Sequence, residues 1–232
     1  MMQSRLTANH VVLAADTLTL EQCLRLGPLI GNRVYAVKIH VLWDRHGPSV
    51  VNQLKEAGFR RVWVDLKLHD TSDTVALRAK EVAEAGGDIV SVHISGGKRM
   101  MQAAKKSGIK VFGITILTSL EEREVMEVYR SDVLQNVMSL ALKAKQAGID
   151  GVVCSPREVV VLASWNELAG LKFVTPGVRS PGKEVHDQKR VGTPAKARED
   201  GSNLLVMGRQ LTEAEDPVVE LDHVEGELSL PS

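Results

Sequence analysis

Short apolar runs and amphipathic stretches alternate along the whole chain. The apolar runs are rich in Val and Ile, and eight of them stand out: residues 11–15, 34–39, 61–65, 89–93, 110–116, 151–154, 172–174 and 203–207. Near-continuous apolar runs of β-branched residues are typical of parallel strands that are buried on both faces of a sheet. The pattern therefore predicts eight buried parallel strands.

The stretches between these runs predict helices. Clear examples are residues 20–30, 48–58, 73–86, 98–108 and 132–148. Several of them end in Ala-Gly or Ser-Gly shortly before the next apolar run, as the C-terminal caps of helices do. Because strand and helix alternate eight times within 232 residues, we expect an α/β fold, a single-domain (β/α)8 TIM barrel spanning residues 1–232.

An open, doubly wound sheet is the alternative fold. Such a sheet often carries a glycine-rich GxGxxG turn after its first strand. Here the first apolar run leads into AADTLTL at residues 14–20, which lacks that turn, so the barrel is favoured. We expect the two ends of the chain, residues 1–9 and 226–232, to be frayed.

The composition of the chain limits which binding partners and which cellular compartment we expect. The 29 Lys and Arg residues balance 29 Asp and Glu residues, which excludes a nucleic-acid binder that relies on bulk positive charge. Cys23 and Cys154 are far apart in the sequence, which argues against a disulfide scaffold or a thiolate metal site and fits a reducing compartment. There is no apolar core of a signal peptide and no apolar run of about 18 residues. We therefore expect a cytoplasmic protein with no nucleic-acid partner and no membrane contact.

Charged residues gather where the third strand ends, in the run DLKLHD at residues 65–70. Active sites of such barrels lie at the carboxyl ends of the strands. Residues two apart on a strand face the same side, so Asp65 and Lys67 should both project into the barrel mouth, with Lys38 arriving from the second strand and Asp70 just beyond in the loop. Buried charges are costly unless they are paired, and each opposite neighbour favours the charged form. A purely structural ion-pair network is the alternative; the position in the barrel favours a catalytic role.

A second candidate site is a phosphate-binding one. Barrels commonly bind phosphate with the loops after the seventh and eighth strands and a helix N-terminus. Gly208 allows close approach of the backbone to a ligand, and Arg209 offers a planar fork of donors. Arg179 and Gln188 lie in the polar segment after the seventh strand and are further candidates.

Motifs of one enzyme family occur in order along nearly the whole chain. They are AAD at 14–16, VK at 37–38, DLKLHD at 65–70, VH…GGK at 92–98, ILTS at 116–119, VVCS at 152–155, VTPGVR at 174–179, DQKRVGTP at 187–194 and VMGRQLTEAEDP at 206–217. A DxKxxD motif alone is shared by a wider suprafamily, but the ordered set is more particular. On these motifs the chain resembles the orotidine 5′-monophosphate decarboxylases.

The resemblance implies an activity and a catalytic set. The reaction is the cofactor-independent decarboxylation of orotidine 5′-phosphate to UMP and CO2, the last step of de novo pyrimidine nucleotide synthesis, with no metal. Lys67 is similar to the family's catalytic lysine, which protonates C6 of the pyrimidine. Lys38, Asp65 and Asp70 complete the family's charged tetrad, and Asp70 would come from the neighbouring subunit of a homodimer.

The resemblance also implies substrate contacts. Asp16 matches the ribose-binding aspartate, Thr74 falls where the family contacts ribose across the dimer, and Thr118 matches the turn that recognises the pyrimidine. The positions that match the phosphate contacts are Arg179, Gln188, Gly208 and Arg209.

The loop after the catalytic lysine departs from the family. Members commonly read Asp-Ile-Pro-(Asn/Thr)-Thr, whereas this chain reads Asp-Thr-Ser-Asp-Thr at residues 70–74. The chain thus lacks a proline that would fix φ, and it adds the carboxylate of Asp73 beside Asp70.

Three alternatives stay open on the residues alone. Sugar-phosphate decarboxylases acting on 3-keto-gulonate 6-phosphate and hexulose-phosphate synthases share DxKxxD, but they use Mg²⁺ and carry a carboxylate where this chain has Lys38. A metal-dependent epimerase would use His40, His69 and His93 as ligands. A barrel that binds a phosphate ligand without activity would lack the lysine or a tetrad carboxylate, and all four are present.

Overall fold

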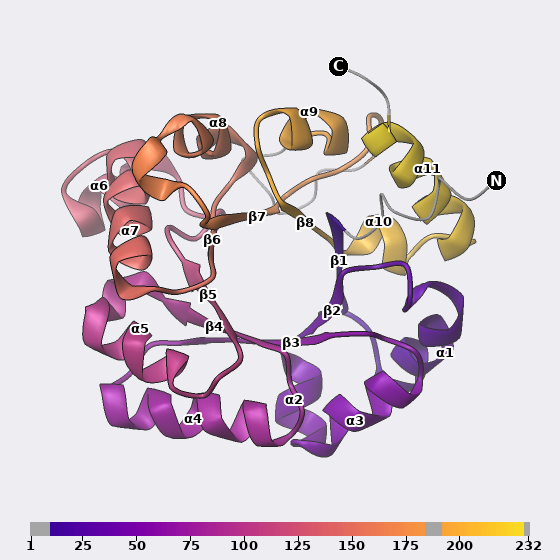
Figure 1. Cartoon of the computed structure of the whole chain (residues 1–232). Helices are drawn as coiled ribbons and strands as arrows, with labels where there is room; N and C mark the ends of the chain where they lie inside the picture. The colour runs from indigo at the N-terminus through magenta and orange to yellow at the C-terminus, as the bar shows by residue number, and fades with distance from the viewer. Residues whose placement is uncertain (1–9, 184–191, 230–232) are drawn as a thin grey trace.

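Eight parallel strands close into a barrel in the order of the sequence, with β8 paired to β1 (Figure 1). The computed structural model describes residues 10–183 and 192–229. The strands are β1 Val11–Ala14, β2 Ala36–Ile39, β3 Val62–Leu68, β4 Ile89–His93, β5 Lys110–Ile114, β6 Gly151–Val153, β7 Lys172–Pro176 and β8 Leu204–Met207. This confirms the predicted single-domain (β/α)8 barrel.

Each predicted apolar run contains a strand, but three strands end two or more residues away from the predicted end. β3 continues to Leu68 and β7 to Pro176, while β5 stops at Ile114. Backbone groups make the pairing in a sheet, so a strand can continue past its apolar run into polar residues. The two strands that are longer than predicted, β3 and β7, continue in this way toward the mouth of the barrel.

The helices form a ring outside the strands (Figure 1). They are α1 Leu20–Ile30, α2 Val41–His46, α3 Ser49–Glu56, α4 Ser72–Glu84, α5 Gly97–Lys105, α6 Glu122–Tyr129, α7 Val133–Ala147, α8 Pro156–Ser164, α9 Pro194–Glu199, α10 Arg209–Thr212 and α11 Pro217–Ser229, with 3-10 turns η3 Ile94–Gly96 and η4 Asn166–Leu168. Local sequence explains several ends. Thr19 forms a capping box with Gln22, and Gly148 ends α7 in the left-handed conformation at φ 75°.

The carboxyl end of the chain is more ordered than predicted. α11 continues through Ser229, so the expected fraying is wrong for residues 226–229. Arg33 binds this helix through Asp222 at 2.5 Å and Glu225 at 2.9 Å, which fixes it against the start of the barrel. Residues 1–9 and 230–232 lie outside the described residues. Within the described part of the chain, no helix has the length and apolar character to cross a membrane.

Large apolar side chains fill the middle of the barrel. Val12, Trp63, Ile89, Phe112 and Leu204 belong to one buried cluster inside the strands. The rings of Trp63 and Phe112 meet edge to face, with centroids 5.2 Å apart and an interplanar angle of 89°. This packed layer separates two mouths, which we call the carboxyl mouth and the amino mouth after the strand ends that surround them.

Candidate active site

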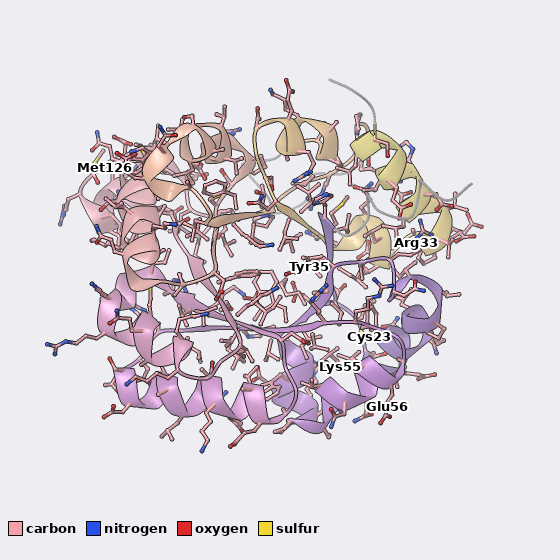
Figure 2. The ribbon with its side chains drawn as sticks, in the orientation of Figure 1. Cys23, Arg33, Tyr35, Lys55, Glu56 and Met126 are labelled. Carbon is pink, nitrogen blue, oxygen red and sulfur yellow. The ribbon has the colours of Figure 1, made fainter. Side chains whose placement is uncertain are left out.

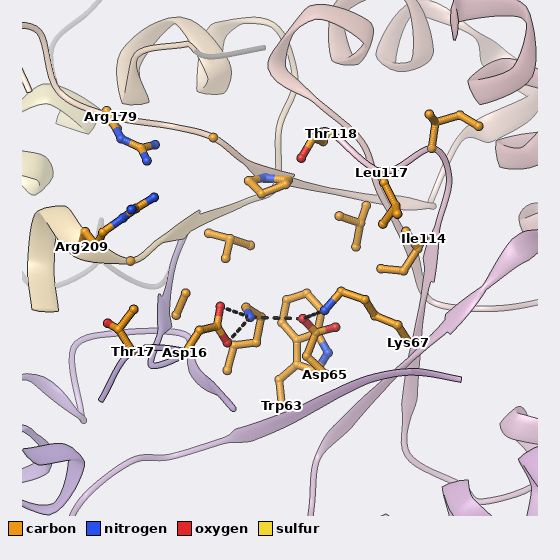
Figure 3. A pocket seen from close by; sticks show the side chains of 18 residues that line it. Asp16, Thr17, Trp63, Asp65, Lys67, Ile114, Leu117, Thr118, Arg179 and Arg209 are labelled. Carbon is orange, nitrogen blue, oxygen red and sulfur yellow. Dashed lines mark hydrogen bonds and ion pairs between the residues drawn. The ribbon is translucent and has the colours of Figure 1, made fainter. Parts of the chain in front are cut away.

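A cavity of about 440 Å³ occupies the carboxyl mouth. Its lining comes from strand ends around the barrel: Ala14, Asp16, Thr17, Lys38, Trp63, Asp65, Lys67, Ile114, Ile116, Leu117, Thr118, Val153, Pro176, Gly177, Arg179, Val206, Gly208 and Arg209. Figure 3 shows charged side chains on one side of this cavity and two arginines on another. A volume of this order suits a small organic ligand.

Four charged side chains form a continuous array in the cavity (Figure 3). The ammonium of Lys38 donates to both carboxylate oxygens of Asp16 at 2.8 Å and lies 3.1 Å from Asp65. Lys67 donates to the same oxygen of Asp65, Oδ2, at 2.6 Å. Cations and carboxylates therefore alternate in the order Asp16, Lys38, Asp65, Lys67, as the spacing of DLKLHD and the neighbouring β2 predicted for the last three.

Burial and charge oppose each other at the centre of this array. Asp65 is 3% exposed, and its burial alone would raise the pKa of the carboxyl, but the positive charges of Lys38 and Lys67 outweigh burial and lower that pKa to about 2. Burial would lower the pKa of Lys38, but Asp65 and Asp16 outweigh it and raise that pKa. Both groups are therefore charged at neutral pH, and each holds the other in that state.

A bulge in β3 brings Asp65 and Lys67 into the cavity. Val64 pairs with Val90 and Leu68 with Val92, so four residues of β3 span the distance of two on β4. Lys67 has φ 50°, a left-handed conformation that costs a non-glycine residue roughly 1–2 kcal/mol. The prediction that both side chains face the mouth is confirmed, but the backbone that achieves it is irregular rather than a regular pleat.

Ser91 on β4 holds the bulge together. Its fully buried hydroxyl donates to Asp65 Oδ1 at 2.5 Å and accepts from the backbone N–H of Lys67 at 3.0 Å. The hydroxyl thus gives the N–H of Lys67 the hydrogen-bond partner that regular strand pairing would have supplied. It also orients the carboxylate of Asp65 between the two lysines. Sequence reasoning missed Ser91; its signal was a polar residue in the middle of the apolar run IVSVH, at an inward position.

Asp70 and Thr74 do not line the cavity of their own chain. Both are exposed at the start of α4, where Asp70 accepts from the N–H of Thr71 at 2.6 Å and the hydroxyls of Thr74 and Thr71 lie 3.1 Å apart. α4 begins after Thr71 without a proline, and Asp73 lies in its first turn, where the helix dipole favours a negative charge. One chain therefore brings together Lys38, Asp65 and Lys67 of the tetrad.

Arg179 and Arg209 lie together at the side of the cavity away from Lys67 (Figure 3). Arg209 is the first residue of α10, directly after Gly208, and Arg179 follows β7. Gln210 ties these two segments together, because it accepts from the N–H of Ser180 at 3.0 Å and donates to its hydroxyl at 2.6 Å. Gln188 lies outside the described residues.

The remaining lining contains residues that sequence reasoning missed. Thr17, which follows the predicted Asp16, and Leu117, which precedes the predicted Thr118, both line the cavity. Trp63 and Ile114 stand at inward positions of their strands and form part of the apolar floor. Period-two alternation along β3 and β5 was the available signal for these two.

The three histidines of the epimerase alternative do not converge. The Nδ1 atom of His40 lies 2.6 Å from the carbonyl oxygen of Asp65, and the rings of His69 and His93 lie 5.4 Å apart. Among residues 10–183 and 192–229, no three His, Cys, Asp or Glu side chains are grouped as metal ligands. The geometry therefore does not support a histidine-based metal centre.

Comparisons with known proteins show the family of the chain. The family described as "Orotidine 5'-phosphate decarboxylase / HUMPS family" matches residues 9–224. The orotidine 5'-phosphate decarboxylase of Actinobacillus succinogenes is 36% identical over 230 residues, covering 95% of this chain and 98% of the relative. That of Vibrio atlanticus is 42% identical over 193 residues, covering 79% and 82%.

Solved structures give the same result. The crystal structure of orotidine 5'-phosphate decarboxylase from Lactobacillus acidophilus superposes with a TM-score of 0.81 at 32% identity, covering 95% of this chain and 99% of that one. With a matched family over most of its length and curated relatives above 30% identity, this chain belongs to the orotidine 5′-phosphate decarboxylase / HUMPS family.

Proposed function

We propose that this protein decarboxylates orotidine 5′-phosphate to UMP and CO2 without a metal or organic cofactor. The observation that carries the proposal is the array of Asp16, Lys38, Asp65 and Lys67 in one cavity, with Arg179 and Arg209 on another side of it. If the two arginines bind the phosphate of a nucleotide, its pyrimidine can lie next to the charged array in the same cavity. The curated relatives carry the name of this activity.

The proposed reaction breaks the bond between C6 and the carboxylate carbon. CO2 leaves, the electron pair remains on C6, and the ammonium of Lys67 supplies the proton that forms the new C6–H bond; solvent then reprotonates the amine. A fixed cation next to C6 stabilises the charge as it develops, and the same group is in position to protonate it. Asp65 holds the ammonium of Lys67 in place at 2.6 Å.

The other contacts in this proposal bind and orient the nucleotide. Asp16, with its half-exposed side chain, accepts from a ribose hydroxyl, and Thr118 meets the edge of the pyrimidine. Arg179, Gln188, Gly208 and Arg209 hold the phosphate. Binding energy from these remote contacts serves orientation at C6.

Lys38 separates this reading from the Mg²⁺-dependent members of the suprafamily. Its ammonium lies between Asp16 and Asp65 and already supplies the positive charge with which a metal ion would otherwise neutralise these two carboxylates. The test is the loss of orotidine 5′-phosphate absorbance with EDTA present. Undiminished turnover in EDTA is expected; turnover that requires added Mg²⁺, or none on this substrate, would overturn the proposal.

We also propose that the site is completed across a homodimer. Asp70 and Thr74 lie exposed at the start of α4, and the neighbouring surface of that helix carries Leu77, 69% exposed, beside a small hollow that is also lined by the turn after α5. In the dimer, Asp70 of the partner subunit would stand next to Lys67, and Thr74 of the partner subunit would meet the ribose.

Mixing two inactive variants tests the shared site. Lys67→Ala and Asp70→Ala chains each lack one half of the site, so a heterodimer regains one intact site, and activity should return on subunit exchange. Absence of rescue after exchange has been verified by mass spectrometry would contradict the shared site, while the decarboxylation proposal would still rest on the EDTA assay.

A further inference from the structure

Basic side chains occupy the first inward layer of the barrel at the amino mouth. Residues two apart on a strand face the same way, and Val12, Trp63, Phe112 and Val174 all face the interior. The residues two positions before them, on the odd-numbered strands, are His10, Arg61, Lys110 and Lys172. The odd-numbered strands therefore present basic groups to this mouth.

Three of these cations surround one buried tyrosine, Tyr35, which Figure 2 shows within the ring of strands. The guanidinium carbon of Arg61 lies 4.7 Å from the centre of the Tyr35 ring, and the ammonium groups of Lys110 and Lys172 lie 5.5 and 5.9 Å from it. Lys110 also donates to the Tyr35 hydroxyl at 2.9 Å, and Arg61 donates to the Tyr35 carbonyl oxygen at 3.2 Å. Three positive charges are thus held close to a single ring.

The carboxylates at this rim are each paired with a different lysine. Asp88 accepts from the N–H of Val62 and binds Lys55 at 3.0 Å. Asp150 accepts from the N–H of Val111 and binds Lys105 at 2.7 Å.

The third equivalent position, before β8, is the neutral Asn203, which accepts from the N–H of Phe173 at 2.7 Å. Within the described residues, Arg61, Lys110 and Lys172 have no ion-pair partner.

The groups around these cations are neutral or positive and do not compensate their charge. The ring of His10 lies 3.0 Å from the carbonyl oxygen of Asn203, and burial, with the charges of Arg198 and Lys172, lowers its pKa. Arg198 donates to the carbonyl oxygen of Ser202. Like charges gathered at one rim repel one another, so an anion that neutralises them would stabilise the fold.

We propose that the amino mouth binds a small tetrahedral oxyanion such as inorganic phosphate, at a site separate from the carboxyl mouth. Arg61 supplies a planar fork and the two lysines supply further donors, a set that suits several oxygens on one anion. Arg61 already covers the Tyr35 ring, so that ring is not offered to a nucleobase. Lys110 on β5 and Lys172 on β7 bring their ammonium groups to the anion from beside the same ring.

The test measures Tm against inorganic phosphate at constant ionic strength. It uses an Arg209→Ala background, which removes a phosphate contact from the carboxyl mouth. Phosphate at 20-fold its dissociation constant should raise Tm by about 4 °C. Lys110→Met and Lys172→Met, each added to this background, should weaken phosphate binding at least about tenfold. The control Lys143→Met removes one exposed lysine from α7 and should leave the phosphate response unchanged.

Two further measurements test which anions bind and whether the lysines repel one another when no anion is bound. Sulfate should substitute for phosphate, whereas nitrate at the same ionic strength should not. Without phosphate and at low salt, the Lys110→Met and Lys172→Met proteins should melt no lower than the background, because repulsion is relieved. A phosphate response that survives both substitutions, or no response in the background, would overturn the proposal. A lower Tm in both variants together with an unchanged response would assign the lysines to packing on Tyr35 and would overturn it as well.

Discussion

Charged side chains line both mouths of the barrel, but only in the carboxyl mouth do they form a paired array. There, Asp16, Lys38, Asp65 and Lys67 alternate in sign with contacts of 2.6 to 3.1 Å. At the amino mouth, Arg61, Lys110 and Lys172 surround Tyr35, and the rim carboxylates are held by other lysines. A paired array fixes the position of each charge, which a reaction requires; a group of like charges leaves a field that attracts a counter-ion.

Backbone strain follows the same division. Near the amino end of β3, Trp63 and Val64 keep regular register with Ile89 and Val90. The bulge and the left-handed Lys67 come only where β3 enters the carboxyl mouth. Strain of this kind persists where the surrounding contacts over-determine it, and Ser91 supplies two such contacts. The strained backbone therefore lies at the end of the barrel where charges must be placed precisely relative to one another.

The largest effect is expected from Lys67→Met. Loss of the fixed cation and of the proton donor together should lower kcat more than about 10⁴-fold on orotidine 5′-phosphate. UMP binding, followed by calorimetry, should remain measurable, because Arg179 and Arg209 are untouched. Lys143→Met, which removes an exposed lysine on α7, is the matched control. Substantial residual turnover would show that Lys67 is not the proton donor. The paired array of the carboxyl mouth would then lack the catalytic role that distinguishes it from the amino mouth.

Arg209→Ala should act on substrate binding. Loss of charge-assisted hydrogen bonds to the phosphate, worth roughly 1.5–3 kcal/mol, should raise KM about 10- to 100-fold. Steady-state kinetics give KM, and Arg45→Ala, at an exposed arginine of α2, serves as the control. An unchanged KM would place the phosphate elsewhere.

Two buried serines at opposite ends of the barrel allow a matched comparison. Ser91→Ala removes the hydroxyl that holds Asp65 and the N–H of Lys67, so kcat should fall about tenfold while KM changes less. Ser202→Ala removes an equally buried hydroxyl, which donates to Thr175 at 2.7 Å near the start of β8, and should leave kcat within about twofold. Equal losses of kcat in both variants would mean that Ser91 acts only through stability.

Acid should destabilise the protein in two separate pH windows. Burial lowers the pKa of His10 at the amino mouth and of His93 at the end of β4, so their contributions to the free energy of unfolding are lost as pH falls from about 6.5 through those pKa values. The pKa of Asp65 is lowered from 3.8 to about 2, so its contribution, about 2 kcal/mol, is lost only as pH falls through that lower range.

Urea unfolding at a series of pH values measures both windows. His10→Asn should reduce the loss of stability in the upper window, in which His93 still titrates, and leave the lower window unchanged, since Asn203 and Asp65 are at opposite ends of the barrel. A His10→Asn protein with the parent's pH dependence between 7 and 5 would show that burial at the amino mouth does not perturb this histidine.

The strands and most of the helices could be predicted because their cause is local in the sequence. Strands buried on both faces need continuous apolar runs, so 89–93 was predicted with the observed bounds. The same rule ended β3 at Asp65, since it cannot see backbone pairing that continues through Lys67 to Leu68. The helical end at residues 226–229 was missed because Arg33 and its partners on α11 are far apart in the sequence.

The sequence predicted the charged residues of the candidate site but not the polar residues that hold them in place. Period-two alternation put Asp65 and Lys67 in one mouth, and the adjacent strand brought Lys38. Ser91 and Gln210 are polar residues whose partners belong to other segments, so no local pattern distinguishes them from ordinary polar positions.

The sequence alone determined the eight-stranded barrel, the end of it that carries the chemistry, and the identity of the alternating charges, because hydrophobic periodicity and strand order are properties of the chain itself. Only the tertiary structure decided that β3 bulges, that Lys67 adopts a left-handed backbone with the hydroxyl of Ser91 as its support, and that three cations meet around Tyr35. These features depend on contacts between strands distant in sequence, whose energies exist only once the barrel has closed.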